Sequence, residues 1–304
     1  MISKLRVCAA AAVSIVLVAM TPTGAGATFP GDNGRILFNR GSIERPTVIV
    51  SMGPGGSDVT RLTRRGQNSF GSSWDPDGSR FIYSRLDNDG DVDLFLRDAD
   101  GSNPTRVTDT PKRDEFQVAF GPDGNQVVYQ GCRNQCDLFI TDLTTGTATR
   151  VTETLADEIA PDWSVDDVIV FERSPRRAGD IDIFTINPDG SDRTLLTRNR
   201  RRQDVSASWS PDGTRIVYSR CGFESGCDLF TMDPDGSGKD RITRTKADEF
   251  GAHFSPDGRS LVVSRSRGET MSDLYRMRTN GRRLRRLTDT PNSFEVDPDW
   301  QPVL

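Results

Sequence analysis

Short apolar runs alternate along this chain with turns made of proline, aspartate and glycine. In the stretch 249–288 the predicted strands cover 249–254, 260–264, 273–277 and 285–288. The first two are joined by Ser255-Pro256-Asp257-Gly258, in which proline presets φ and glycine accepts the positive φ that ends such a turn. The last two are joined through Asn280-Gly281, a strong hairpin signal. The pattern therefore predicts four short antiparallel strands.

This unit returns at a nearly constant interval. An aromatic residue ends the first apolar run of each copy, and successive aromatics are 46, 43, 46, 45 and 46 residues apart. They are Trp74, Phe120, Trp163, Trp209, Phe254 and Trp300. A period of about 40–50 residues built of strands and turns is typical of a β-propeller with one blade per repeat. The sequence predicts an all-β, six-bladed propeller of four-stranded antiparallel blades, with the aromatics packed between neighbouring blades.

The two ends of the repeat array complement each other. Residues 33–40 align with the second strand of later repeats, and no first strand precedes them. The missing first strand is found at the other end of the chain, at Phe294–Trp300. We therefore expect the C-terminal strand to complete blade 1, which would close the ring and remove two exposed sheet edges.

Residues 1–27 have the composition of a secretory signal peptide. Two basic residues precede an apolar stretch, 7–20, that is too short to span a bilayer, and Ala25-Gly26-Ala27 is a small-residue cleavage motif. We expect cleavage after Ala27, a single propeller domain over 28–304, no membrane span, and a secreted or periplasmic location. The net charge of −5 argues against nucleic acid as a partner.

Four cysteines follow the predicted leader in two close pairs, Cys132/Cys136 and Cys221/Cys227. Each pair sits where the second strand of a blade turns into the third, so the two strand ends face each other. We expect two local disulfides in an oxidising compartment, each contributing roughly 2 kcal/mol. The alternative is a zinc site, which would need sulfurs from different blades.

The run Trp209-Ser210-Pro211-Asp212-Gly213, together with 228–236 and 240–243, resembles the repeat of TolB-type β-propellers. The opening at 29–38 is similar to secreted bacterial members of that family. The resemblance extends over 28–304 and implies the propeller fold, in a member without the α/β domain that precedes the TolB propeller. It leaves the function open, because binding proteins, peptidase accessory domains and some enzymes share this repeat.

Candidate binding residues lie five positions before each aromatic, where the chain enters the innermost strand of a blade. One is Ser69, and the other five are the carboxylates Glu115, Glu158, Asp204, Glu249 and Glu295. If they point into the channel, they form a negatively charged mouth that could hold a cation, a basic side chain or water. The alternative, which we favour, is that they are part of the repeat's construction, bonded to loop N–H groups or to Arg106, Arg150 and Arg241.

Two further charged segments depart from the repeat. The residues Asp87, Asp89, Asp91 and Asp93 alternate in a loop with a glycine, which suggests either a calcium site or an acidic hairpin tip in water. The basic residues Arg198, Arg200, Arg201 and Arg202 lie in a mouth loop and could contact an anionic partner. We favour the hairpin tip for the first segment.

Catalytic motifs are scarce in this sequence. It has one histidine, His253, and lacks a Gly-x-Ser-x-Gly elbow. We therefore expect a secreted, monomeric, non-enzymatic binding or scaffolding propeller without a cofactor, which takes a protein, a peptide or a cell-envelope glycan at the channel mouth. The alternative is a metal-dependent hydrolase or lyase that uses the channel carboxylates, with Ca²⁺ as the candidate ion.

Overall fold

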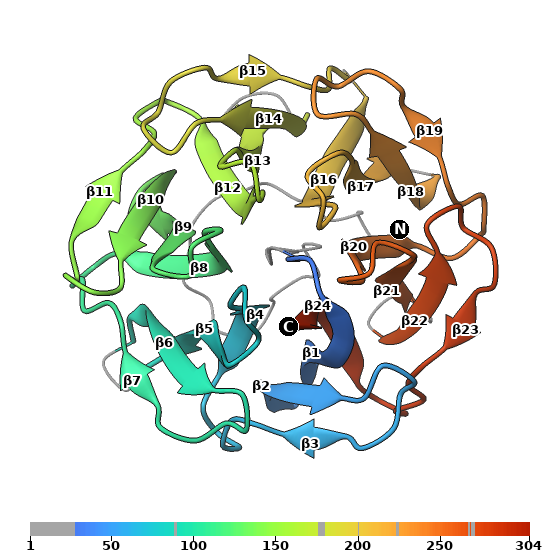
Figure 1. Ribbon diagram of the computed structural model, residues 1–304, viewed down its shortest axis with the longest axis horizontal. Coiled ribbons are helices and arrows are strands. Elements are labelled where there is room, and N and C mark those ends of the chain that lie inside the picture. The colour runs from blue at the N-terminus through green and yellow to red at the C-terminus, as the bar shows by residue number, and fades with distance from the viewer. Residues whose placement is uncertain are drawn as a thin grey trace, which may run out of the picture.

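The computed structural model describes residues 28–87, 90–175, 180–199, 201–222, 225–266, 268 and 271–304. In this part of the chain, 24 strands form six four-stranded antiparallel sheets arranged as a ring around a central channel (Figure 1). The six-bladed propeller predicted from the sequence is confirmed. The predicted leader, 1–27, lies outside the described residues, and among those described there is no helix that could cross a bilayer.

Each blade runs from a first strand at the channel to a fourth strand at the rim (Figure 1). The first strands of blades 1 to 6 are β24 (Phe294–Val303), β4 (Ser69–Trp74), β8 (Asp114–Phe120), β12 (Asp157–Trp163), β16 (Arg202–Trp209) and β20 (Glu249–Phe254). The second strands are β1 (Asp32–Ser42), β5 (Arg80–Leu86), β9 (Gln126–Cys132), β13 (Ile169–Ser174), β17 (Ile216–Gly222) and β21 (Ser260–Ser266). The third strands are β2 (Arg45–Met52), β6 (Val92–Asp98), β10 (Cys136–Asp142), β14 (Asp182–Ile186), β18 (Gly226–Met232) and β22 (Ser272–Arg278). The fourth strands are β3 (Thr60–Arg61), β7 (Thr105–Arg106), β11 (Ala148–Arg150), β15 (Thr194–Leu195), β19 (Asp240–Arg241) and β23 (Arg285–Arg286).

The ring closes as predicted, through the C-terminal strand. β24 pairs antiparallel with β1 from Asp32 opposite Val303 to Gly41 opposite Phe294. Blade 1 is therefore built from both ends of the propeller, so that unfolding of either end opens the ring. Such closure leaves no unpaired inner strand at which another chain could add.

The six aromatics fill the seams between blades, as predicted. Trp74 of blade 2 clusters with Leu37 and Ile49 of blade 1, and Trp300 of blade 1 clusters with Val262 of blade 6. All six are at most 4% exposed. Each aromatic thus packs on the preceding blade, and the hydrophobic core is divided into seams around the ring.

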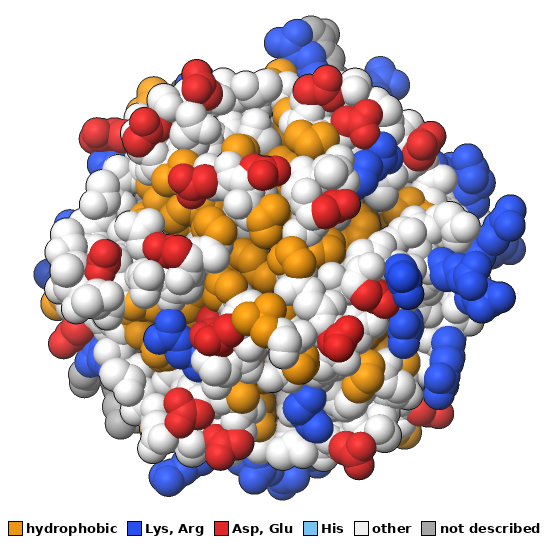
Figure 2. All heavy atoms as spheres, viewed as in Figure 1, with side chains coloured by type: hydrophobic (Ala, Val, Ile, Leu, Met, Phe, Trp, Pro, Cys, Tyr) orange, Lys and Arg blue, Asp and Glu red, His pale blue; other side chains and the backbone are white. Residues whose placement is uncertain are grey.

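The fourth strands are shorter than the sequence suggests, and a threonine two residues beyond each of them accepts a bond through its side chain. In blade 6 the predicted strand 285–288 contains only two paired residues, and the buried Thr288 Oγ1 accepts a bond from the Leu274 amide at 3.0 Å. The same bond recurs in every blade, with Thr63, Thr108, Thr152, Thr197 and Thr243. The rim outside these threonines is strongly charged beside β22 and β23 (Figure 2), which disfavours pairing of sheet edges.

Every first strand contains a β-bulge. The residue two positions after the candidate site residue has φ between 50° and 60° in all six blades, and the pairing register shifts there. These residues are Gly71, Gln117, Ala160, Ser206, Gly251 and Asp297. Residues five apart on a regular strand point to opposite faces, and one extra residue reverses this relation. The bulge therefore directs both the carboxylate and the aromatic of a blade toward the preceding blade.

Candidate binding site at the channel mouth

The candidate carboxylates mark one end of the ring. Glu158 is the second residue of β12 and Glu249 is the first residue of β20, at the end where the chain arrives from the preceding blade. Their side chains do not project into open solvent, since all five carboxylates are 0% exposed. Within the described residues no three acidic, histidine or cysteine side chains are grouped so that they could hold a metal ion.

Each buried carboxylate pairs with an arginine. In four blades this arginine is the residue directly opposite on the second strand. The pairs are Glu295–Arg40 at 2.7 Å, Glu158–Arg173 at 3.2 Å, Asp204–Arg220 at 2.7 Å and Glu249–Arg265 at 3.0 Å. In blade 3 the opposite residue is Gly131, and Arg113 supplies the guanidinium to Glu115 at 3.1 Å instead.

A loop side chain also binds each carboxylate, and we call the carboxylate, its arginine and this side chain a clamp. Thr108 donates to Glu115 at 2.8 Å, Thr245 to Glu249 at 2.5 Å, and Asn199 fills the same role for Asp204. Thr154 and Thr290 do so for Glu158 and Glu295. The carboxylates thereby fix the loops that lead into the innermost strands.

Burial shifts the titration of these groups. Desolvation raises the pKa of Glu115 to about 7, and it also raises the pKa values of Glu158 and Glu249, although their hydrogen bonds act in the opposite direction. A group that is easier to protonate than usual is a weak ligand for a hard cation at neutral pH.

In each pair the guanidinium group is the more accessible partner. The arginines of the five clamps have side chains 15–30% exposed, in front of carboxylates that are 0% exposed. Blade 2 has the arginine without the acid: Arg85 faces Ser69, and its guanidinium lies 3.5 Å from the centroid of the Phe95 ring. The half-buried rings of Phe70 of blade 2 and Phe116 of blade 3 stack with their centroids 5.8 Å apart.

The arginines proposed as partners from the sequence were the wrong ones. Arg106, Arg150 and Arg241 instead pair with Asp93, Asp137 and Asp228, each at the start of a third strand. The reason is position: these arginines end the fourth strand and so lie next to the third strand, with the second strand between them and the first.

The acidic segment of blade 2 is partly neutralised. Arg106 contacts Asp93 at 2.6 Å and Asp87 at 3.4 Å, while Asp87 Oδ1 accepts a bond from the Asp91 amide. Asp89 lies outside the described residues. In the basic segment, Arg198, Arg201 and Arg202 are exposed, and Arg200 lies outside the described residues.

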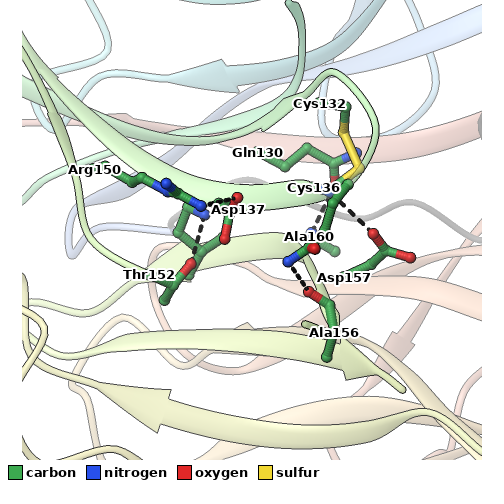
Figure 3. Close-up of a disulfide and its surroundings, with 11 residues drawn as sticks. Gln130, Cys132, Cys136, Asp137, Arg150, Thr152, Ala156, Asp157 and Ala160 are labelled. Carbon is green, nitrogen blue, oxygen red and sulfur yellow. Dashed lines mark hydrogen bonds and ion pairs between the residues drawn. A yellow bond between two sulfur atoms is a disulfide. The ribbon is translucent and has the colours of Figure 1, made fainter. Parts of the chain in front are cut away.

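Both predicted disulfides are present. Cys132 is bonded to Cys136, and Cys221 to Cys227, each across the hairpin between the second and third strands of its blade. Figure 3 shows the first bond beside the neighbouring blade, where the Cys136 amide donates to Asp157 at 3.0 Å. The disulfide therefore braces a hairpin that contacts the next blade near the mouth.

Sequence reasoning missed the side chains that hold the bulges. Gln130 of blade 3 accepts a bond from the Ala160 amide of blade 4 at 3.0 Å (Figure 3). Glu172 of blade 4 accepts one from the Ser206 amide of blade 5 at 2.6 Å, and its burial raises its pKa to about 8. Each of them directly precedes the second-strand residue that lies opposite the candidate carboxylate. An alignment of the repeats would have shown this shared position.

Two further buried carboxylates were also missed. Asp162 accepts bonds from the Trp163 amide and, at 2.7 Å, from the Trp209 amide of the next blade. Asp299 does the same with Trp300 and with Trp74 of the next blade. Burial raises the pKa of Asp162 to about 8 and that of Asp299 well above its usual range. Each of these aspartates joins two blades. In the sequence, both can be recognised as an aspartate directly before the seam tryptophan.

Comparison with known proteins agrees with this architecture. The model of the TolB β-propeller domain matches residues 56–250. The chain belongs to the TolB β-propeller family. An uncharacterized protein of Agrobacterium fabrum, Atu1656, is 29% identical over 148 residues, which are 47% of this chain and 48% of that relative. The chain thus aligns with about half the length of the curated relative.

Solved structures share the fold at low identity. TolB from Acinetobacter baumannii superposes with a TM-score of 0.77 at 20% identity, covering 90% of this chain and 68% of TolB. An oligogalacturonate lyase in complex with manganese has a TM-score of 0.62 at 20% identity, covering 87% of this chain and 77% of the lyase. Membership of the TolB family supports a binding or scaffolding role, and the disulfides fit an extracytoplasmic location.

Proposed function

We propose that this protein is an exported binding module that takes an acidic, extended segment of a partner protein or peptide at the channel mouth. The proposal includes cleavage after Ala27, a secreted or periplasmic location and action as a monomer. The observation that carries it is the difference in exposure within each ion pair at the mouth, where the carboxylate is buried and the arginine is partly exposed.

This arrangement favours a ligand of the opposite charge to the cation that the sequence analysis considered. A ring of free carboxylates would attract cations, but here each of the five carboxylates is buried and paired, and the partly exposed member of each pair is the guanidinium group. Guanidinium groups bind carboxylates through paired, charge-assisted hydrogen bonds. An acidic segment therefore complements the mouth better than a basic segment or a metal ion.

Apolar contacts would supply the remaining affinity. Phe70, Phe116 and Ile159 directly follow the candidate site residues of three consecutive blades and are half-buried. A peptide with apolar side chains between its acidic residues could cover these groups while its carboxylates meet the arginines. Aromatic and arginine side chains are the residue types that contribute most at interfaces.

Arg85 offers a clean test, because its replacement leaves no buried carboxylate unpaired. Fluorescently labelled oligoglutamate and oligolysine peptides of equal length would be titrated into the protein at low salt, with anisotropy as the readout. We expect the glutamate peptide to bind with strong salt dependence and Arg85→Gln to weaken it several-fold. Arg278→Gln, on the exposed rim of blade 6, is the matched control and should bind like the parent.

Binding of the lysine peptide in preference to the glutamate peptide, or equal binding by Arg85→Gln and the parent, would contradict the proposal. Competition by soluble anionic envelope glycans but not by acidic peptides would assign the site to a glycan instead. Calcium or manganese retained by the purified protein at one ion per chain, with loss of binding on chelation, would favour the alternative of a metal-dependent hydrolase or lyase.

A further inference from the structure

A pocket of about 460 Å³ lies between blades 5 and 6, at the end of the blades opposite the clamped carboxylates. Phe254 and Ile242 form its apolar floor, and Phe254 is 4% exposed. Asp212, Asp240 and Asn280 stand at its exposed rim. The pocket is separate from the channel mouth, so its ligand is a separate question.

The other seams show what normally occupies this position. Four of them contain the larger indole of tryptophan in place of Phe254, at Trp74, Trp163, Trp209 and Trp300. The seam between blades 2 and 3 also has phenylalanine, Phe120, and there Arg80 covers it. The guanidinium carbon of Arg80 lies 5.8 Å from the ring centroid, and its Nη2 donates to the Gly124 carbonyl at 2.8 Å.

Blade 5 has the equivalent arginine, but it points elsewhere. Arg215 precedes the second strand of blade 5 as Arg80 begins that of blade 2, and it bonds Thr231 at 2.9 Å and Asp233. We attribute this difference to one residue. Asp75 holds Arg80 over the seam through an ion pair at 2.8 Å, whereas the counterpart of Asp75 in blade 5 is Ser210, which offers no charge.

The charges at the rim favour a cation. Asp212 bonds the hydroxyl groups of Ser210 and Thr214, and among the described residues neither Asp212 nor Asp240 pairs with lysine or arginine. The two arginines of the lining are already neutralised, Arg215 by Asp233 and Arg241 by Asp228, both outside the lining. The pocket therefore combines an aromatic floor, the turn glycine Gly258 and uncompensated carboxylates.

We propose that this pocket binds a guanidinium group, presented as an arginine side chain by a partner protein. The seam between blades 2 and 3 supplies the geometry: a planar cation over a phenylalanine ring, bonded to the turn glycine of the next blade. In the seam between blades 5 and 6 that cation comes from outside the chain. The flat shape distinguishes arginine from lysine, whose ammonium cannot stack on the ring.

The direct test uses three small probes at constant ionic strength. Nα-acetyl-arginine methylamide would be titrated into the full protein and followed by NMR, beside the corresponding lysine and citrulline derivatives. We expect the arginine probe to bind with a millimolar dissociation constant and both others to bind at least five-fold more weakly. Citrulline keeps the planar shape without the charge, so it separates the two contributions.

Two variants close the pocket in ways that other blades already use. Phe254→Trp introduces the indole of four other seams, and Ser210→Asp should draw Arg215 over Phe254 as Asp75 draws Arg80. Each should weaken the arginine probe at least ten-fold while the melting temperature stays at or above that of the parent. If Phe254→Trp fails to fold, Ser210→Asp decides alone.

Equal binding of the arginine and lysine probes, or unchanged arginine binding in a folded Ser210→Asp protein, would overturn the proposal. Asp240→Asn removes a rim charge without filling the pocket, and we expect it to weaken the arginine probe several-fold and leave citrulline binding unchanged. A loss of citrulline binding in this variant would show that the carboxylate acts through the pocket's shape, which would also contradict the assignment.

Discussion

Glu172 contributes a pH dependence to the stability of this propeller that a single substitution can remove. Its side chain is 2% exposed and accepts the Ser206 amide of the next blade, with no arginine or lysine partner among the described residues. Burial raises its pKa from 4.5 to about 8. The folded state therefore holds the proton more tightly than the unfolded state. The stabilisation is complete below about pH 4.5 and is lost as the pH rises through about 8.

The size of the effect follows from the shift. One pKa unit corresponds to about 1.4 kcal/mol, so Glu172 lowers the free energy of unfolding by about 4 kcal/mol between pH 5 and pH 9. Glu172→Gln removes this loss and keeps an oxygen that can accept the Ser206 amide. Blade 3 already uses this arrangement, with Gln130 bonded to Ala160. We expect the variant to melt roughly 10 °C above the parent near pH 9 and close to the parent near pH 5.

The assay is thermal unfolding by circular dichroism in matched buffers from pH 5 to pH 9, with chemical denaturation at the two ends of the range. The difference between the two proteins is the readout, because Asp162 and Asp299 change the stability of both in the same direction. Parallel curves for parent and variant would refute the reasoning, since they would mean that Glu172 ionises normally in the folded state. A variant that is less stable at pH 9 would refute it equally.

Three further outcomes follow from the same structure. Deletion of Phe294–Leu304 removes the strand paired with β1 and the Trp300 seam, and should give insoluble protein or a melting temperature lowered by at least 15 °C; a truncated chain that melts like the parent would rule out closure by β24. Gly251→Ala should lower the free energy of unfolding by about 1 kcal/mol in urea denaturation, because φ is 57° there, although the new methyl group has room. Ala160→Gly, at φ 50°, should leave the free energy of unfolding unchanged or raise it. Millimolar calcium should leave the melting temperature of the parent unchanged, because arginines neutralise the mouth carboxylates, and an upward shift that disappears in Glu249→Gln would show a metal site there.

The fold was predictable from the sequence because its information is periodic. A turn such as Ser255–Gly258 and an aromatic such as Phe254 recur at a nearly constant interval, and the number of copies gives the number of blades. The disulfides followed from the same alignment, since Cys132 and Cys136 occupy facing strand ends. These inferences needed only the order of elements along the chain.

The site was predicted less well because it depends on the registers between strands. The pairing of Glu249 with Arg265 requires knowing that the two residues lie opposite each other, and the bulge at Gly251 changes the face on which side chains after it emerge. A glycine occupies the bulge position in blades 2 and 6, but Ala160 and Ser206 adopt the same conformation without this signal. Tertiary bonds from neighbouring blades enforce it there.

Blade 3 separates construction from function in this protein. It lacks the arginine opposite its carboxylate, since Gly131 occupies that position, yet Arg113 reaches the same Glu115 from the loop just before β8. A contact that is rebuilt by a different residue when its usual partner is missing belongs to the construction of the repeat. The pocket over Phe254 is different, because side chains occupy the equivalent space in other seams. The construction of the repeat does not explain it. In a molecule made of repeats, the positions where one blade departs from the rest are therefore the places to look for ligands, and the arginine probe and the Arg85→Gln variant examine two of them.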